Sequence, residues 1–117
     1  MSTREIPRDE WMTFFDSFSR RYEGWLVTVE MLGDDIGAQV EVRELPLVGI
    51  VVDLKGSDEA AISIIIGEEA QDHITHTITQ PTHVRFEETG EAEHMTLQIE
   101  PAGGATTLVN FFSLGSS

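Results

Sequence analysis

The fold is decided by residues 11–31, WMTFFDSFSRRYEGWLVTVEM, in which the hydrophobic period changes at Gly24. Before Gly24, five aromatic side chains recur at helical spacing; they are Trp11, Phe14, Phe15, Phe18 and Tyr22. After Gly24, apolar residues mostly alternate with polar ones as far as Phe112. Because hydrophobic period is the strongest structural signal in a single sequence, this change predicts one helix followed by a run of strands.

The predicted helix covers about residues 7–23. Pro7 suits the first helical position, where a missing N–H costs nothing, and Gly24 is a typical helix stop. At 3.6 residues per turn, the five aromatic side chains fall within an arc of roughly 100°. This stripe predicts a helix that docks on the sheet as a lid, although a helix that binds a partner would carry the same stripe.

The registers of the first two predicted hairpins follow from the face on which apolar residues gather, because a one-residue slip moves every side chain to the other face. In the first hairpin this criterion pairs Val29 with Val40. In the second hairpin it pairs Val52 with Ile64 across the polar loop 56–59.

The second predicted hairpin is apolar on both sides. Its reverse face carries Val51 and Ile65, which a sheet with one covered face would leave in water. We therefore expect a second layer over these two residues, preferably the helix and otherwise another subunit. If the helix lies elsewhere, Val51 and Ile65 mark an interface with a partner.

The third predicted hairpin turns near Pro81. Setting Ile74 opposite Phe86, and His76 opposite Val84, separates the polar side chains from the apolar ones. A fourth hairpin follows, and its register stays open because two pairs of side chains compete for the inner face: Val109 with Phe111, and Leu108 with Phe112.

Eight strand-like runs and one helix predict an α+β fold. An N-terminal amphipathic helix would pack on an antiparallel β-meander of about seven to eight strands, forming a barrel-like or sandwich sheet. The β-rich region covers about residues 25–112, and residues 113–117 form a tail. The length of 117 residues suits a single domain with one core.

Charge and composition restrict the partners. There are 21 acidic residues and 7 basic ones, so the formal net charge is −14. This charge opposes binding to nucleic acid and to anionic membrane surfaces. The charged N-terminus and the absence of a long apolar run predict a cytoplasmic protein. Cysteine is absent, which excludes disulfides and thiolate chemistry.

The four histidines raise the question of a metal site; they are His73, His76, His83 and His94. Strand residues three apart point to opposite faces, so His73 and His76 should not share an ion. In the predicted register His73, His83 and Glu87 share the outer face, where a solvated cross-strand pair is commoner than a metal centre. We therefore expect no metal and no cofactor.

His76 is predicted to face the core. It is either a core histidine with a hydrogen-bond partner or a polar group inside a ligand-binding barrel, together with Trp25. No nucleophile motif and no phosphate-binding loop stands out, so an enzyme is not expected.

Several segments carry a family resemblance: IPRDEW, FFDSFSRRYEGWLVTVE, DDIGAQVE, ELPLVGI, HITHTI and PTHVRFE. Together they resemble a family of small bacterial proteins known only as a domain of unknown function, the DUF 5335 type, over roughly residues 4–112. The resemblance implies a bacterial, cytoplasmic, stand-alone domain. It implies no activity, and it assigns no functional residue.

The sequence therefore favours a small, soluble, non-enzymatic module that works through protein–protein contact or self-association. Its partner would be an unknown protein or a second copy of the chain. The alternative is a small-molecule-binding β-barrel with His76 in the pocket.

Overall fold

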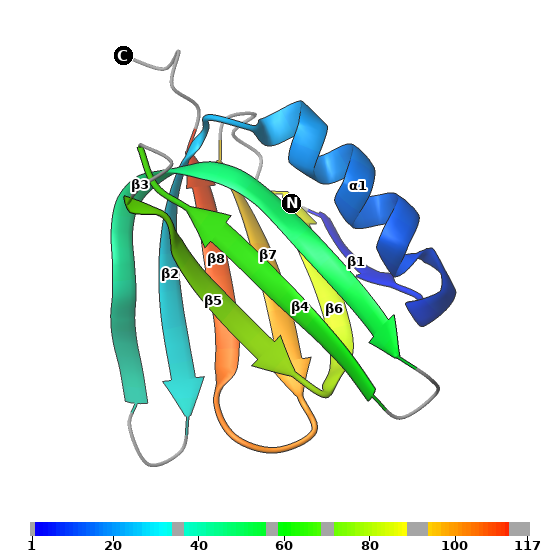
Figure 1. The fold of residues 1–117 in the computed structure, drawn as a ribbon. Helices are drawn as coiled ribbons and strands as arrows, with labels where there is room; N and C mark the ends of the chain where they lie inside the picture. The colour runs from blue at the N-terminus through cyan, green and yellow to red at the C-terminus, as the bar shows by residue number, and fades with distance from the viewer. Residues whose placement is uncertain (1, 34–36, 56–58, 69–71, 89–93, 113–117) are drawn as a thin grey trace.

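The computed structural model describes residues 2–33, 37–55, 59–68, 72–88 and 94–112. These residues form one α-helix, one short 3-10 helix and eight strands (Figure 1). In chain order the elements are β1 (Ser2–Ile6), η1 (Arg8–Glu10), α1 (Trp11–Tyr22), β2 (Leu26–Gly33), β3 (Gly37–Lys55), β4 (Glu59–Ile66), β5 (Ile74–Thr79), β6 (Pro81–Glu88), β7 (His94–Pro101) and β8 (Thr106–Phe112).

The strands form a single antiparallel sheet in the order β1-β6-β7-β8-β2-β3-β4-β5. The sheet is bent into two layers: the second half of β3 crosses in front with β4 and β5, and the remaining strands lie behind (Figure 1). The two terminal strands, β1 and β5, do not pair with each other in the described part of the chain. The sheet is therefore open, and the prediction of a barrel-like closure is not confirmed.

The two layers are joined by a corner in β3. The ladder between β2 and β3 ends at Leu26, the first residue of β2, which lies opposite Pro46. The next residue of β3, Leu47, already pairs with Ile66 of β4. At this corner Glu44 has a φ of 52°, in the left-handed region, and Pro46 has no N–H to offer a ladder. Both features favour a bend over a straight strand, so β3 leaves β2 and continues into the front layer.

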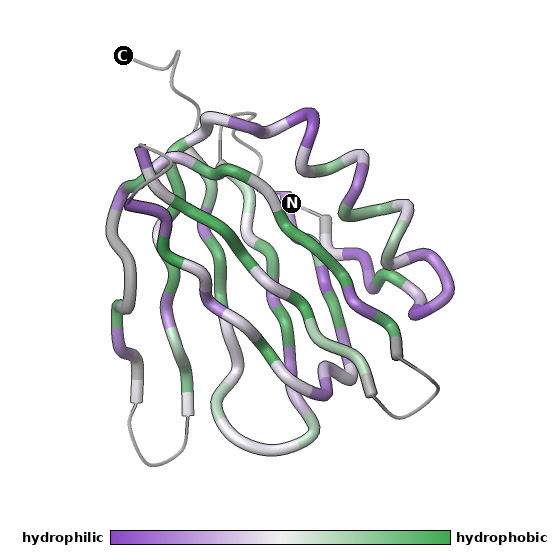
Figure 2. Tube along the Cα trace, viewed as in Figure 1, coloured by the Kyte–Doolittle hydropathy of each residue, from purple (hydrophilic) through white to green (hydrophobic). Residues whose placement is uncertain are grey.

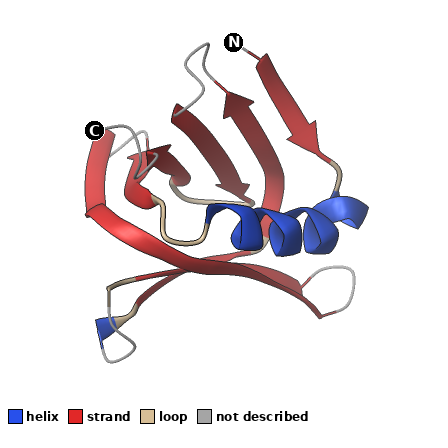
Figure 3. Ribbon diagram, turned by 90° about the horizontal axis from the view of Figure 1, so that it is seen from above, coloured by secondary structure: helices blue, strands red, loops and turns tan. Residues whose placement is uncertain are grey.

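Helix α1 fills the fork that this bend opens. Figure 3 shows it lying between the two layers, beside the second half of β3. The Ser19 hydroxyl accepts a hydrogen bond from the Ile50 N–H at 2.8 Å and donates one to the Ile50 carbonyl at 3.1 Å. The Trp11 indole N–H donates to the Ile6 carbonyl at 2.9 Å. The helix is thus attached to both layers. Ser19 binds the N–H and carbonyl of Ile50, which lies in β3 beyond the end of the ladder with β2.

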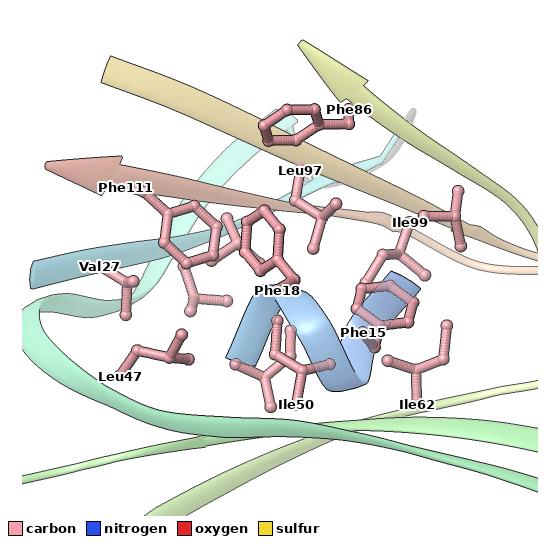
Figure 4. Close-up of a cluster of buried hydrophobic side chains, with 14 of the residues drawn as sticks. Phe15, Phe18, Val27, Leu47, Ile50, Ile62, Phe86, Leu97, Ile99 and Phe111 are labelled. Carbon is pink, nitrogen blue, oxygen red and sulfur yellow. The ribbon is translucent and has the colours of Figure 1, made fainter. Parts of the chain in front are cut away.

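The core lies around the aromatic stripe of α1 (Figure 4). The Phe18 ring lies against the rings of Phe86 and Phe111, with centroid distances of 5.4 and 5.0 Å. On the other side of the helix lie Ile50 and Ile62 of the front layer. All of these side chains are buried, and each large apolar group removed from water contributes about 1.5–3 kcal/mol.

The predicted helix is confirmed over Trp11–Tyr22, with its stripe turned inward, whereas its expected first turn is the separate 3-10 helix η1 after Pro7. Trp11 and Phe15 are 1% exposed. Along the strands, apolar and polar stretches alternate, as expected when the two faces of a strand have different surroundings (Figure 2). The sequence-based division at Gly24 missed β1, which precedes the helix and pairs with β6. A five-residue strand with two charges gives too short an alternation to stand out.

The registers predicted for the first two hairpins were wrong. Val29 pairs with Val42, not Val40, because β2 and β3 contain two irregularities that shift the ladder. Val52 pairs with Ile62, not Ile64. That second shift is by two residues, an even number, so the predicted inner face still points inward.

The third predicted hairpin does not exist, because β5 and β6 are in different layers. His76 of β5 pairs with Ile64 of β4, whereas Val84 of β6 pairs with Ile6 and Ile99. Gln80 lies between the two strands with a φ of 51° and turns the chain from one layer to the other. The sequence criterion compared β5 only with the next strand, β6. It could not detect that the apolar face of β5 matches β4 equally well.

The fourth hairpin is confirmed, and its inner face is settled. Met95 pairs with Phe111 and Leu97 with Val109, and all four side chains are buried. None of the described helices is long and apolar enough to cross a membrane.

The Ser19 contact gives a first prediction. Ser19→Ala should lower the free energy of unfolding by about 1–2 kcal/mol, because the Ile50 N–H loses its acceptor (about 1–3 kcal/mol) while alanine recovers about 0.5 kcal/mol of helix propensity. Urea denaturation measures the change. Ser17→Ala on the exposed side of the same helix is the control and should lie within about 0.5 kcal/mol of the wild type. Equal losses in the two variants would contradict the proposed docking contact.

Candidate functional site

The outer face of the back layer is polar, and its charged groups bind one another. Glu5 of β1 lies 2.9 Å from the His83 Nδ1 and 3.5 Å from the Arg85 Nε. Arg85 also donates to the Glu100 carboxylate. This hydrogen bond lowers the pKa of Glu100 from its ordinary value of 4.5, and it raises the pKa of Arg85. The cluster is a network of ion pairs across β1, β6 and β7.

A second network continues across the same face. Thr96 donates to the Asn110 side chain at 2.8 Å, and the Asn110 amide donates to Glu30 at 3.1 Å. These contacts link β7, β8 and β2. The outer face of the back layer is therefore a solvated surface whose polar side chains are occupied by each other.

The outer face of the front layer is different, and we call it the neutral face. Cross-strand pairing places Val51, Ser63 and Thr77 side by side. Their neighbours on the same side are mostly small or β-branched; the residues of this face whose side chains the structure describes are Val51, Asp53, Ala61, Ser63, Ile65, Thr75, Thr77 and Thr79, and Gly49 lies beside Ile65. Asp53 is the one charged residue in this set, and the ladder continues from it to Lys55 opposite Glu59 at the end of the hairpin. Val51 is 53% exposed, an unusual position for a valine in the middle of a strand.

The neutral face contains both residues that the sequence marked as an interface. The prediction that the helix covers Val51 and Ile65 was wrong, because α1 lies in the fork, on the other side of the front layer. Val51 is exposed and Ile65 is half-buried. Of the two alternatives left open by the sequence, the interface is the one that agrees with the position of the helix.

A groove of about 590 Å³ runs between α1 and strands β1 and β6, and we call it the aromatic groove. Its floor consists of four rings: Phe14, Phe18, Tyr22 and Phe86. Arg4 of β1 and Arg21 of α1 also line it. The Arg4 guanidinium carbon lies 5.8 Å from the Phe14 ring centre, and the Arg21 carbon lies 5.5 Å from that of Tyr22.

His76 faces inward, as the sequence predicts, and it is half-buried. Its Nε2 lies 3.3 Å from the Oγ1 of Thr107, a buried threonine of β8. His76 thus joins β5 to the opposite layer. This contact agrees with the interpretation of His76 as a core histidine with a hydrogen-bond partner.

Trp25 is half-buried at the other end of the sheet, with its ring 4.8 Å from that of Tyr22. Its neighbour Leu26 pairs with Phe112, five residues along β8 from the Thr107 that contacts His76. At about 3.3 Å per strand residue this separation is about 17 Å. The structure does not bring His76 and Trp25 into one pocket, and neither lines the aromatic groove.

The remaining histidines are not gathered either. His83 is held by Glu5, and His73 lies on the strand-free segment before β5, so the predicted outer-face set with Glu87 does not form. The side chain of His94 lies outside the described residues. Within the described ranges no three His, Asp or Glu side chains are close enough to hold a metal ion.

The sequence also missed the aromatic groove. Its walls come from positions 4, 14 and 86, which only the folded sheet brings together. One signal was present: in TREI, Arg4 shares its face with Ile6, so a strand at residues 2–6 would have directed Arg4 inward.

The fold and these surfaces define a class of protein: a small α+β domain in which one helix fills the fork of an open, bent antiparallel sheet. The chain belongs to a family of unknown function, DUF5335, whose model matches residues 2–114. This confirms the resemblance seen in the sequence. An uncharacterized protein of Aquifex aeolicus (strain VF5) is 33% identical over 88 residues, covering 75% of this chain and 73% of that protein. No solved structure matches the chain.

The ion pair on the polar face predicts a specific acid sensitivity. Because Arg85 lowers the pKa of Glu100 in the folded state, the stabilisation is complete above the ordinary pKa of 4.5 and is lost as the pH falls through the folded value. Glu100→Gln should therefore lose less free energy of unfolding than the wild type between pH 7 and pH values below 4.5. Urea denaturation across this range measures the difference.

The control for this experiment is Glu23→Gln, which removes the same charge and leaves the Arg85–Glu100 pair intact. The part of the acid-induced loss that comes from the pair should persist in this variant. The same acid dependence in Glu100→Gln and the wild type would contradict a stabilising pair.

Proposed function

We propose that the protein is a non-enzymatic module that associates with a second copy of itself through the neutral face. The observation that carries this proposal is the exposed Val51 at the centre of a nearly uncharged surface on a strongly acidic chain.

Charge is the first argument for a second copy as the partner. Two chains of net charge −14 repel each other, so they approach most easily where acidic side chains are fewest. The neutral face has Asp53 and, at the end of its hairpin, the oppositely charged pair Lys55 and Glu59, whereas the back layer presents Glu5, Glu30 and Glu100 on its outer side. A surface of this kind fits an isologous contact, in which the same patch serves both subunits.

The edge next to the neutral face gives a second argument. Terminal strands usually carry charges that discourage pairing with another chain. The terminal strand β1 follows this rule with Arg4 and Glu5, whereas β5 reads ITHTIT and has no acidic or basic residue apart from His76. Ile74 at its start is 44% exposed. The front layer therefore lacks protection against association on its edge as well as on its face.

The distribution of ionised groups supports a non-enzymatic role. Two described groups with shifted pKa values, Arg85 and Glu100, are bonded to each other on an outer sheet surface and do not line the aromatic groove. Such a pair stabilises the sheet and leaves neither group as a ready proton donor or acceptor. The proposal includes a bacterial, cytoplasmic setting without nucleic-acid or membrane partners, which rests on the net charge and the family.

Sedimentation equilibrium of the wild type tests this proposal. We expect a reversible dimer that Val51→Asp converts to a monomer, because the substitution places two buried like charges in the interface. Val40→Asp is the matched control: Val40 lies on the same strand, in the back layer, and is 43% exposed. It should leave the dimer intact. A wild-type chain that stays monomeric at millimolar concentration, or equal effects of the two variants, would contradict the proposal.

A further inference from the structure

We propose that the aromatic groove binds a small organic monoanion with a flat apolar body and one carboxylate or equivalent group. The inference is independent of the neutral face and goes beyond self-association. The groove volume of about 590 Å³ falls within the range of about 300–1,000 Å³ that is typical of small-molecule sites.

The floor of the groove selects the flat body. Phe14 lies 5.4 Å from Phe18 and 6.0 Å from Phe86, and Phe18 lies 4.6 Å from Tyr22, measured between ring centres. Phe14 and Tyr22 are half-buried, so their rings still offer surface to the groove. From Phe14 to Tyr22 the row extends about 12 Å along the helix, at 1.5 Å per residue. A planar ring system gains both apolar burial and ring contacts on such a floor.

Arg4 provides the charge that selects an anion. It pairs with Phe86 in the β1–β6 ladder, so its side chain lies on the groove side, over the Phe14 ring. Among the described residues Arg4 forms no ion pair, although the chain has three times as many acidic residues as basic ones. Stacking on a ring leaves the N–H groups of a guanidinium free, and their fork matches a carboxylate.

Arg21 adds a second cation at the far end of the ring row. It also stacks on a ring, that of Tyr22, and within the described ranges it too forms no ion pair. Arg20, its neighbour, does form one, with Asp16 at 3.3 Å. Both arginines that line the groove are thus without an ion pair in the described part of the chain; Arg8, outside the groove, shares this state.

The acidic lining residues restrict the ligand to one negative charge. Asp9 and Glu10 precede α1, where carboxylates favour the helix N-terminus, and Glu88 ends β6. A second negative charge on the ligand would face these carboxylates. A monoanion therefore fits better than a dianion such as a phosphate monoester.

A structural explanation of Arg4 competes with this one. Charged residues that point inward on an edge strand discourage pairing with other chains, and β1 is an edge strand. For edge protection, the charge of Arg4 is sufficient and no ligand is needed. For ligand binding, the guanidinium of Arg4 must contact an anion that lies on the ring floor. A binding measurement separates the two.

The test uses four probes with the same bicyclic body: naphthoate, naphthalenemethanol, naphthylmethylammonium and naphthalenedicarboxylate. Each is titrated into the nitrogen-15-labelled full-length chain, and the shifts of the amide NMR signals give both the affinity and the site. We expect naphthoate to bind about tenfold or more tightly than the cationic probe, with the largest shifts in α1, β1 and β6. Naphthalenedicarboxylate, the dianion, should bind more weakly than naphthoate.

Arg4→Gln should weaken naphthoate binding about tenfold or more, because a charge-assisted hydrogen bond is lost. Arg8→Gln is the matched control, since Arg8 also stacks on a helix aromatic, with its guanidinium carbon 5.3 Å from the Trp11 ring centre, and does not line the groove. It should change the affinity by no more than about twofold. Glu88→Gln should strengthen naphthoate binding, a gain that loss of folding cannot produce.

Three outcomes would overturn the proposal. The cationic or the neutral probe could bind as tightly as naphthoate, which would leave the arginines without a role. Arg4→Gln could weaken binding no more than Arg8→Gln does, which would leave Arg4 as edge protection. Finally, the shifted amides could lie outside α1, β1 and β6, which would place the ligand elsewhere.

Discussion

The structure depends on the way α1 closes the fork in a bent sheet. A single strand, β3, belongs to both layers, and where it turns away from β2 its backbone groups need new partners. Ser19 supplies them at Ile50, and the ring of Phe18 fills the space behind. Without the helix, the open sheet would expose both a strand edge and its apolar inner face. The helix is therefore an integral part of the core.

This arrangement determines which surfaces remain available. Because α1 occupies the fork, it cannot cover the neutral face, and Val51 stays in water. On the side of the helix that faces β1 and β6, the half-buried rings Phe14 and Tyr22 form part of the floor of the aromatic groove. The same aromatic stripe thus has a buried side that stabilises the fold and a half-buried side that faces the groove. The two proposed functions use different layers and can be tested separately.

The features that depend on local sequence pattern could be predicted, whereas the pairing of strands that are distant in the sequence could not. The helix, the inward stripe and the inner face of the second hairpin follow from period alone, and even a two-residue register error preserved the faces of Val52 and Ile64. Period did not settle the face of β8, and it placed Val40 on the inner face although Val40 is exposed opposite Glu30. The position of β5 beside β4 could not be predicted, because ITHTIT presents a suitable apolar face to more than one neighbour.

The candidate surfaces divide in the same way. Val51 and Ile65 could be predicted, because they are apolar residues at strand positions where a single covered face would require polar ones. The aromatic groove could not, because Arg4, Phe14 and Phe86 are brought together only by the β1–β6 ladder and the helix beside it.

Native-state hydrogen exchange tests most directly whether α1 and the sheet form one cooperative unit. If they do, the amide of Ile50 and the inner amides of α1 should exchange only through global unfolding, with the same free energy as the amide of Leu97 in β7. Exchange of the Ile50 amide through a local opening that costs several kcal/mol less than global unfolding would contradict this, because α1 would then be a detachable lid.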